Sequence, residues 1–213
     1  MVISKIEIQK NNKEKVNIFV DGEYSFSLSL KGVNKYGLYN GRNISENEIK
    51  EIKDEDEKEL AFLFLLDKIS YKMFTEKEIR DKLIKKGFEI DSINYSLEKA
   101  KEYGYINDSY YAKCFIEQRG IPNKWGQQVI YQKLFQKGID KNIIKESLNE
   151  FFDEEDEKEN CYLLACKKMN SIKDFDFDNR NFIDKMYRFL ISKGYSYETI
   201  NSTIEKLKKE ISC

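Results

Sequence analysis

The chain has 213 residues, of which 37 are Lys or Arg, 38 are Asp or Glu and none is His. Because positive and negative charges nearly balance, a uniformly basic coat for nucleic acid is excluded, and any electropositive surface must be local. The lack of His removes the most common general base and metal ligand, so we expect no enzyme activity, no metal site and no cofactor.

The cysteines also give no sign of metal or redox chemistry. They form no Cys-x-x-Cys pair, and we predict buried or idle thiols in a reducing cytoplasm. The first residues contain no long apolar run, and no other segment is long and apolar enough for a membrane span. We therefore expect a soluble, cytoplasmic monomer without a membrane partner. The cysteines are Cys114, Cys161, Cys166 and Cys213.

Residues 1 to about 30 alternate apolar with polar side chains, which is typical of strands that bury one face. Asp21-Gly22 lies between two such runs and predicts a tight hairpin, because both turn positions need positive φ. A lone hairpin is marginally stable, so a small antiparallel sheet needs a third strand or helices to dock on. Two connector helices should follow, one over Leu28 to Tyr36 and one opened by Ser45 with Glu48 at the capping-box position.

The rest of the chain is organised around a stretch that occurs three times, with Lys-Gly at 86–87, 137–138 and 193–194. Around each glycine, apolar residues stand eight and four positions before and six and ten after, so each pair shares one helix face. Lys suits the last turn of a helix, and Gly ends it in a left-handed cap. Each copy is therefore predicted to be a helix, a glycine corner and a second helix. The apolar positions are Ile79, Leu83, Ile93 and Leu97, then Ile130, Leu134, Ile144 and Leu148, then Met186, Leu190, Ile200 and Ile204.

A further helix before each corner helix completes a three-helix repeat. The predicted fold is mainly α: tandem three-helix repeats form an elongated curved array, with a small N-terminal antiparallel β-sheet extension. A unit of about 50 residues buries its apolar stripe poorly alone, so neighbours stack and leave a long concave face for binding. The predicted helices are Asp56 to Tyr71, Thr75 to Lys86, Ile90 to Tyr103, Asp108 to Arg119, Lys124 to Lys137, Asp140 to Phe152, Glu154 to Met169, Asn179 to Lys193 and Ser196 to Ile211. The predicted domains are residues 1–53, 54–106, 107–152 and 153–213.

Two connections between these helices can be interpreted directly. Gly104 ends a helix and Asn107 or Asp108 caps the next, which predicts a rigid elbow between the first two repeats. The third repeat is longer than the others, and its extra residues fall in a polar linker from Ser171 to Asp178.

The run from Thr75 to Gly87, the segment Gly104-Tyr105-Ile106-Asn107-Asp108 with Tyr111-Ala112, and the stretch Leu134 to Ile139 together resemble the RecX family. The resemblance covers essentially the whole chain, including the strand-rich N-terminal extension. It implies tandem three-helix repeats that bind the recombinase RecA and regulate its nucleoprotein filament in homologous recombination, DNA repair and the SOS response. The implied effect is inhibition of the RecA ATPase and of strand exchange, with weak binding to single- or double-stranded DNA.

The middle repeat is the local electropositive candidate. Between Ser109 and Asn149, seven basic residues face three acidic ones, and Trp125 and Tyr131 lie among them. Such a set can form a protein interface or hold a nucleic-acid backbone with stacked bases. The alternative is that Trp125 belongs to the core and the lysines are merely solvated. The candidate partner-binding residues are Arg80, Lys85, Lys86, Arg119, Lys124, Trp125, Lys133 and Lys137.

Three other interpretations stay open. The run Glu55 to Glu59 recurs letter for letter as Glu155 to Glu159, which favours solvated first turns of helices over a cation site. A stand-alone DNA-binding helical repeat protein would place the helix after Asp140, with its lysines, in the major groove. An enzyme would need a convergent acid, base or nucleophile set, and no such set is visible.

Overall fold

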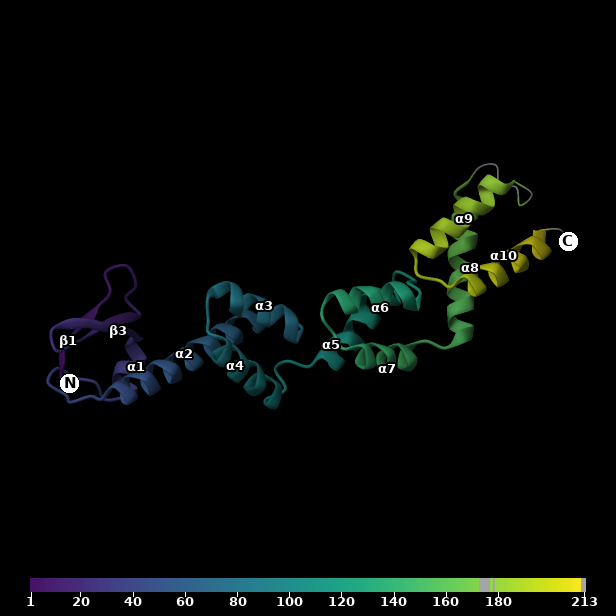
Figure 1. Ribbon diagram of the computed structural model, residues 1–213. Coiled ribbons are helices and arrows are strands. Elements are labelled where there is room, and N and C mark those ends of the chain that lie inside the picture. The colour runs from purple at the N-terminus through teal and green to yellow at the C-terminus, as the bar shows by residue number, and fades with distance from the viewer. Residues whose placement is uncertain (173–176, 178, 212–213) are drawn as a thin grey trace. The chain divides into compact units, whose positions relative to one another are not determined.

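The computed structural model describes residues 1–172, 177 and 179–211 (Figure 1). The chain divides into two compact units, one made of Met1–Met73 and Ile79–Ile106 and the other of Phe74–Glu78 and Asn107–Cys213. Within the described ranges, no helix combines the length and the apolar character that a bilayer crossing requires.

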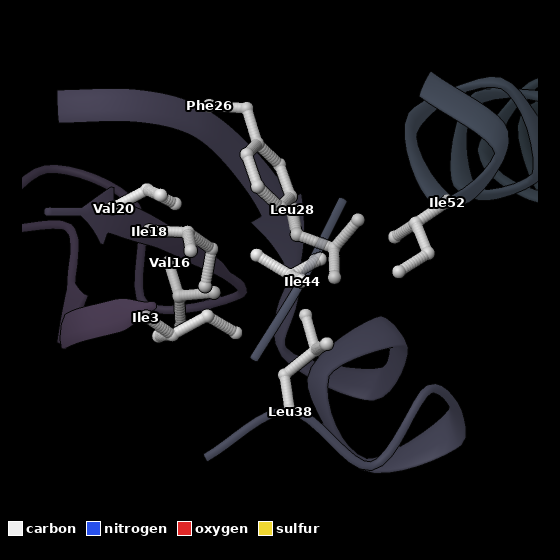
Figure 2. Packing of buried hydrophobic residues seen from close by; sticks show 9 residues of the cluster. All are labelled: Ile3, Val16, Ile18, Val20, Phe26, Leu28, Leu38, Ile44 and Ile52. Atoms are coloured by element: carbon white, nitrogen blue, oxygen red, sulfur yellow. The ribbon is translucent and has the colours of Figure 1, made fainter. Parts of the chain in front are cut away.

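The N-terminal segment forms the predicted antiparallel sheet, with strands β1 (Ile3–Ile8), β2 (Lys15–Val20) and β3 (Glu23–Ser29) in the order β1-β2-β3. The hairpin prediction is confirmed, since Asp21 and Gly22 have φ of 49° and 91°. One face of the sheet is buried against residues that follow it in the chain (Figure 2). Its core consists of Ile3, Val16, Ile18, Val20, Phe26, Leu28, Leu38, Ile44 and Ile52.

After the sheet come α1 (Leu30–Lys35), as predicted, and α2 (Glu46–Ile69). The prediction of a short connector at Ser45 followed by a separate helix from Asp56 is wrong, because α2 is one helix of 24 residues. No Gly or Pro interrupts this stretch, so nothing in the backbone stops the helix. The acidic run 55–59 therefore lies inside α2 and does not begin a helix.

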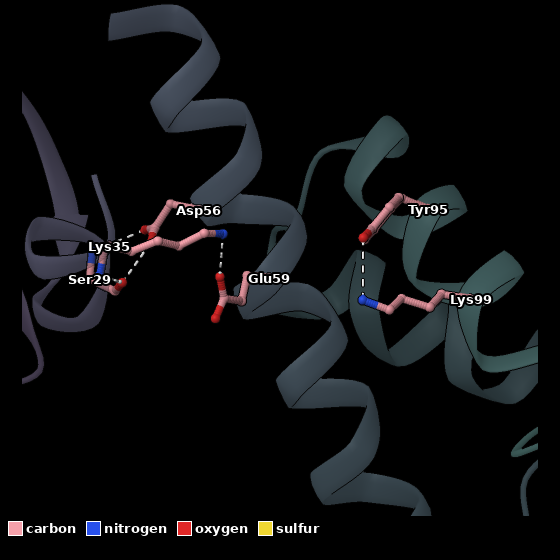
Figure 3. Close-up of polar contacts among 7 residues, drawn as sticks. Ser29, Lys35, Asp56, Glu59, Tyr95 and Lys99 are labelled. Carbon is pink, nitrogen blue, oxygen red and sulfur yellow. Dashed lines mark hydrogen bonds and ion pairs between the residues drawn. The ribbon is translucent and has the colours of Figure 1, made fainter. Parts of the chain in front are cut away.

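Asp56, in that acidic run, is buried and joins α2 to the sheet. Its carboxylate accepts hydrogen bonds from the backbone N–H of Ser29 at 3.0 Å and from the Ser29 hydroxyl at 2.5 Å (Figure 3). The Ser29 hydroxyl oxygen in turn accepts from the N–H of Gly32 at 2.9 Å and caps α1. Asp56 thus links the end of β3, the start of α1 and the middle of α2.

The remaining helices form three-helix repeats, in which the first and third helices pack together: α2 with α4, α5 with α7, and α8 with α10. The predicted fold class is confirmed as mainly helical, with three-helix repeats and a small N-terminal antiparallel sheet. The helices are α3 (Glu76–Lys86), α4 (Ile90–Glu102), α5 (Asp108–Phe115), α6 (Gln127–Gln136), α7 (Lys141–Phe151), α8 (Glu154–Asn170), α9 (Arg180–Ser192) and α10 (Tyr197–Ile211), and a π-helical turn, Ile116–Gly120, follows α5.

All twelve periodic apolar residues around the corners are buried, with at most 5 % of their surface exposed. Gly87, Gly138 and Gly194 adopt φ of 92°, 83° and 95°, the left-handed caps that the pattern predicts. Two boundaries in the middle repeat differ from the prediction. The α-helix α5 ends at Phe115, before the predicted Arg119, and α6 begins at Gln127, so that Lys124 lies in the preceding turn with φ of 49°.

The predicted caps are present. Thr75 and Glu78 form a reciprocal capping box, with both hydrogen bonds at 3.2 Å. Asn107 caps α5, and Asp153 caps α8, so the second acidic run, 155–159, does begin a helix. Most of the predicted linker from Ser171 to Asp178 lies outside the described residues.

The cysteines behave as expected where they are described. Cys114 and Cys161 are buried, and Cys166 is half-buried. Burial raises the pKa of the Cys161 thiol to about 11, which keeps it protonated at neutral pH. Cys213 lies outside the described residues.

Candidate interaction surfaces

The Lys137-Gly138 corner packs against the segment Phe74–Glu78, in the same compact unit. The Thr75 hydroxyl donates to the carbonyl oxygen of Lys137 at 2.8 Å, and the Lys137 ammonium forms an ion pair with Glu78 at 2.7 Å. Burial lowers the pKa of Lys137, but hydrogen bonds to Glu78 and Tyr111 outweigh it and raise that pKa above its ordinary value. The Lys137 charge is therefore permanent and is used within the fold.

The Lys193-Gly194 corner packs in the same way against the start of α6. The N–H of Gly126 donates to the Lys193 carbonyl at 2.8 Å, and the Tyr195 hydroxyl donates to the Lys124 carbonyl at 2.9 Å. A Cβ atom on Gly126 would lie 2.4 Å from the Gly194 oxygen, so the two backbones touch. Thr75 lies twelve residues before Gly87, and Gly126 likewise lies twelve residues before Gly138. The two corners thus form equivalent joints, whereas the sequence had predicted only helix stops.

A half-buried carboxylate lies beside this second joint and gives it a pH dependence. Glu157 accepts a hydrogen bond from the Gln127 side chain at 3.0 Å. Burial raises the pKa of Glu157, and the hydrogen bonds from Gln127 offset this in part. The folded protein therefore binds this proton more tightly than the unfolded chain, and the site stabilises the fold more as pH falls through the raised pKa.

We expect Glu157→Gln to raise the denaturant midpoint at neutral pH, because the amide avoids the cost of a partly desolvated charge and still accepts from Gln127. The advantage should shrink in mildly acidic buffer. Denaturation followed by Trp125 fluorescence measures this, with the exposed Glu159→Gln as control. A variant that is less stable than the parent at neutral pH would contradict the prediction.

The middle repeat, α5 to α7, carries a series of lysines over aromatic rings. Lys133 lies 4.7 Å from the ring centre of Trp125, and Lys141 lies 5.7 Å from that of Phe135. Trp125 is partly buried against the core of this repeat, with Phe115 beside it at 6.2 Å between ring centres. Such cation–π pairs hold ammonium groups close to an apolar surface, which suits a protein interface or a base-stacking platform.

The order of these segments along the chain matches one family from end to end. The family model of the regulatory protein RecX N-terminal domain matches residues 1–45. Those of the first, second and third RecX three-helix domains match residues 61–99, 107–148 and 154–204. The chain belongs to the RecX family. It is thus a member of a family of regulatory proteins, as the sequence resemblance implied.

Individual RecX proteins are similar over most of the chain. A curated protein named Regulatory protein RecX from Clostridium beijerinckii is 41 % identical over 209 residues, covering 96 % of this chain and 95 % of that protein. One from Clostridium botulinum (strain Eklund 17B / Type B) is 36 % identical over 204 residues, with the same coverage. A crystal structure of regulatory protein RecX has a TM-score of 0.70 at 29 % identity and covers 96 % of this chain and 98 % of its own. RecX from Lactobacillus salivarius has a TM-score of 0.65 at 30 % identity and covers 72 % and 98 %.

In this RecX-family chain the predicted binding residues fall into both compact units. Arg80, Lys85 and Lys86 belong to the first unit; Arg80 donates to the Asn94 side chain at 2.8 Å, and both lysines are exposed. The other five belong to the second unit. There Trp125 and Lys133 are in contact, and Arg119 is exposed in the π-helical turn.

Lys124 and Lys137 hold the second unit together through their own contacts. The Lys124 ammonium donates to the Asn160 side chain at 2.8 Å, and Lys137 lies in the joint with Glu78. These two lysines therefore serve the packing of helices, which sequence spacing alone did not indicate.

Sequence reasoning also missed two grooves, one on the RecX first three-helix domain and one on the third. The groove over α2 and α4 has a volume of about 620 Å³ and is lined in part by Lys35, Glu59, Tyr95 and Lys99 (Figure 3). A groove of about 440 Å³ lies over α8 and α10. The one available signal was the recurrence of the run 55–59 at 155–159, which supplies one wall of each groove.

Proposed function

We propose that this chain regulates the RecA recombinase by binding its nucleoprotein filament and slowing ATP hydrolysis and strand exchange. The observation that supports the proposal is the match to all four RecX family models, in order, along the chain. The regulation needs no bond made or broken. A bound protein that favours one state of the filament over another shifts the filament toward that state by the difference in binding free energy.

The charge pattern of the second unit supports an interface with an alternately charged partner. Arg119 and Lys133 are basic groups of α5 to α7 that form no ion pair among the described residues, while α8 begins with four consecutive acidic residues, Glu154 to Glu157. A filament of protein and DNA presents both signs of charge. Complementary charges of this kind chiefly set the rate of encounter and the register of docking. Docked across neighbouring RecA protomers, the chain would hinder the rearrangements that accompany nucleotide turnover.

We expect the unaltered chain to inhibit the RecA ATPase on single-stranded DNA, and the double variant Arg119→Glu, Lys133→Glu to need about tenfold more protein for the same inhibition. Lys137 is left unchanged because its reversal would break the ion pair with Glu78. The matched control is Lys10→Glu, Lys13→Glu, two exposed lysines in the turn between β1 and β2.

The outcomes separate the alternatives. If the unaltered chain binds the filament but does not inhibit, or does not bind it, the proposed function is wrong. Full inhibition by the double variant would remove α5 to α7 from the interface. Tight binding to DNA without RecA, with a steep salt dependence, would favour a stand-alone DNA-binding protein.

A further inference from the structure

The two grooves are lined by the same kinds of residue. The residues that α2 contributes to the first groove lie 100 positions before those that α8 contributes to the second. The lysines from α4 and α10 each follow the corner glycine of their repeat by twelve residues. In the first groove these residues are Glu55, Lys58, Glu59, Phe62, Leu63 and Lys99. In the second they are Glu155, Lys158, Glu159, Tyr162, Leu163 and Lys206.

The geometry recurs as well as the composition. The Lys99 ammonium lies 4.7 Å from the ring centre of Phe62, and the Lys206 ammonium lies 4.4 Å from that of Tyr162. Leu63 and Leu163 expose 43 % and 44 % of their surface beside these rings. Two grooves in separate compact units therefore present the same cation, ring and exposed leucine.

The middle repeat shows that a three-helix unit folds without this arrangement. In the middle repeat, Lys113 occupies the position equivalent to Phe62 and Tyr162. Glu150 occupies the position equivalent to Lys99 and Lys206. The two form an ion pair at 2.6 Å, so this repeat keeps no cation over a ring at these positions. Helix packing alone does not require the groove, and its retention in two of three repeats points to a role in binding.

The chemistry of each groove indicates what would fill it. Among the described residues, neither Lys99 nor Lys206 forms an ion pair with a carboxylate. An occupant with a carboxylate would meet the ammonium, and an adjacent apolar side chain would cover the leucine and the ring. A nucleic-acid backbone fits less well, because it carries a charge at every phosphate and would meet the two glutamates that line one wall of each groove, whereas a single carboxylate can lie at the lysine alone.

We propose that the two grooves are matched docking sites for one polypeptide segment that carries an acidic side chain next to an apolar one. Because the sites are alike, a partner built of identical subunits fills both with the same segment from two subunits. This inference rests on the proposed function, in which the partner is the RecA filament. Two weak contacts on one chain together give tight binding, because the second contact forms within the complex that the first has already made.

The test uses Leu63→Ser, Leu163→Ser and the double variant, and measures binding of the labelled chain to RecA filaments on single-stranded DNA. Each single variant should weaken binding about tenfold, and the double variant about a hundredfold. The leucines are already exposed, so folding should be preserved. The controls are Ile84→Ser and Ile191→Ser, which remove exposed apolar side chains outside the grooves, at matched positions three before a corner glycine.

A second pair of variants tests the charge. The variant with both Lys99→Glu and Lys206→Glu should lose the added affinity for the filament that the two grooves provide. The variant with both Lys99→Arg and Lys206→Arg should bind like the parent, because Arg also pairs with a carboxylate. Parent-like binding by the double serine variant, or an equal loss in the isoleucine controls, overturns this inference but leaves the proposed function standing. Equal losses on bare DNA would assign the grooves to nucleic acid and overturn it too. Failure of the unaltered chain to bind the filament overturns the proposed function and, with it, this inference.

Discussion

Replacing Gly194 by Ala should destabilise the second unit by about 2–5 kcal/mol, because two separate costs add at this corner. The φ of 95° is a left-handed conformation that costs a residue with a Cβ about 1–2 kcal/mol. The added Cβ would also lie 2.6 Å from the backbone nitrogen of Val129 and 2.9 Å from the Gly126 oxygen. Neither backbone atom can move without opening the joint, and overpacking of this kind costs about 1–3 kcal/mol more.

Two other glycines separate these costs. Gly87 has φ of 92° and nothing within 4 Å of an added Cβ, so Gly87→Ala should show the backbone cost alone. A Cβ added to Gly126 would lie 2.4 Å from the Gly194 oxygen, but Gly126 has an ordinary φ of −69°, so Gly126→Ala should show the contact alone. Because Gly126 and Gly194 touch, the double variant should lose less than the sum of the two.

Urea denaturation followed by Trp125 fluorescence measures the second unit directly, since Trp125 is the chain's only Trp and adjoins Gly126. Far-UV circular dichroism measures Gly87→Ala in the first unit. Equal losses for Gly194→Ala and Gly87→Ala would mean that the joint yields freely, and that the two corners are only helix stops.

The second large effect is expected at Asp56. Asp56→Ala should destabilise the first unit by about 3 kcal/mol, because it leaves the Ser29 N–H and hydroxyl without their charged acceptor in a buried place. The loss also loosens the cap of α1, since the Ser29 hydroxyl that holds the Gly32 N–H is itself positioned by Asp56.

The control is supplied by the chain itself. Asp156 occupies the same place in an identical run of five residues but is exposed, so Asp156→Ala should change stability by less than about 0.5 kcal/mol. The two variants are compared by urea denaturation monitored by circular dichroism. Similar small losses in both would show that the hydrogen bonds of Asp56 to Ser29 contribute little to the fold.

The contacts made by the predicted binding residues were the least predictable part of the molecule. A surplus of basic residues in the middle repeat directed attention to Lys124 and Lys137, and both have internal partners in Asn160 and Glu78. The partners lie 36 and 59 residues away, beyond the reach of any helical spacing. The grooves were missed for the same reason, because each needs residues from two helices that sequence periodicity cannot place together.

By itself the sequence determined the local structure: the hairpin at Asp21-Gly22, the helices around each Lys-Gly corner, their buried apolar faces and the caps at Thr75 and Asn107. These features depend on residues within about four positions of one another, where backbone sterics and helix periodicity act. Only the tertiary structure decided that corner glycines form joints, that Asp56 is buried while Asp156 is not, and that two repeats keep a groove. Those outcomes depend on contacts between distant residues, whose burial decides whether a given Asp, Lys or Gly is a surface group or part of the packing.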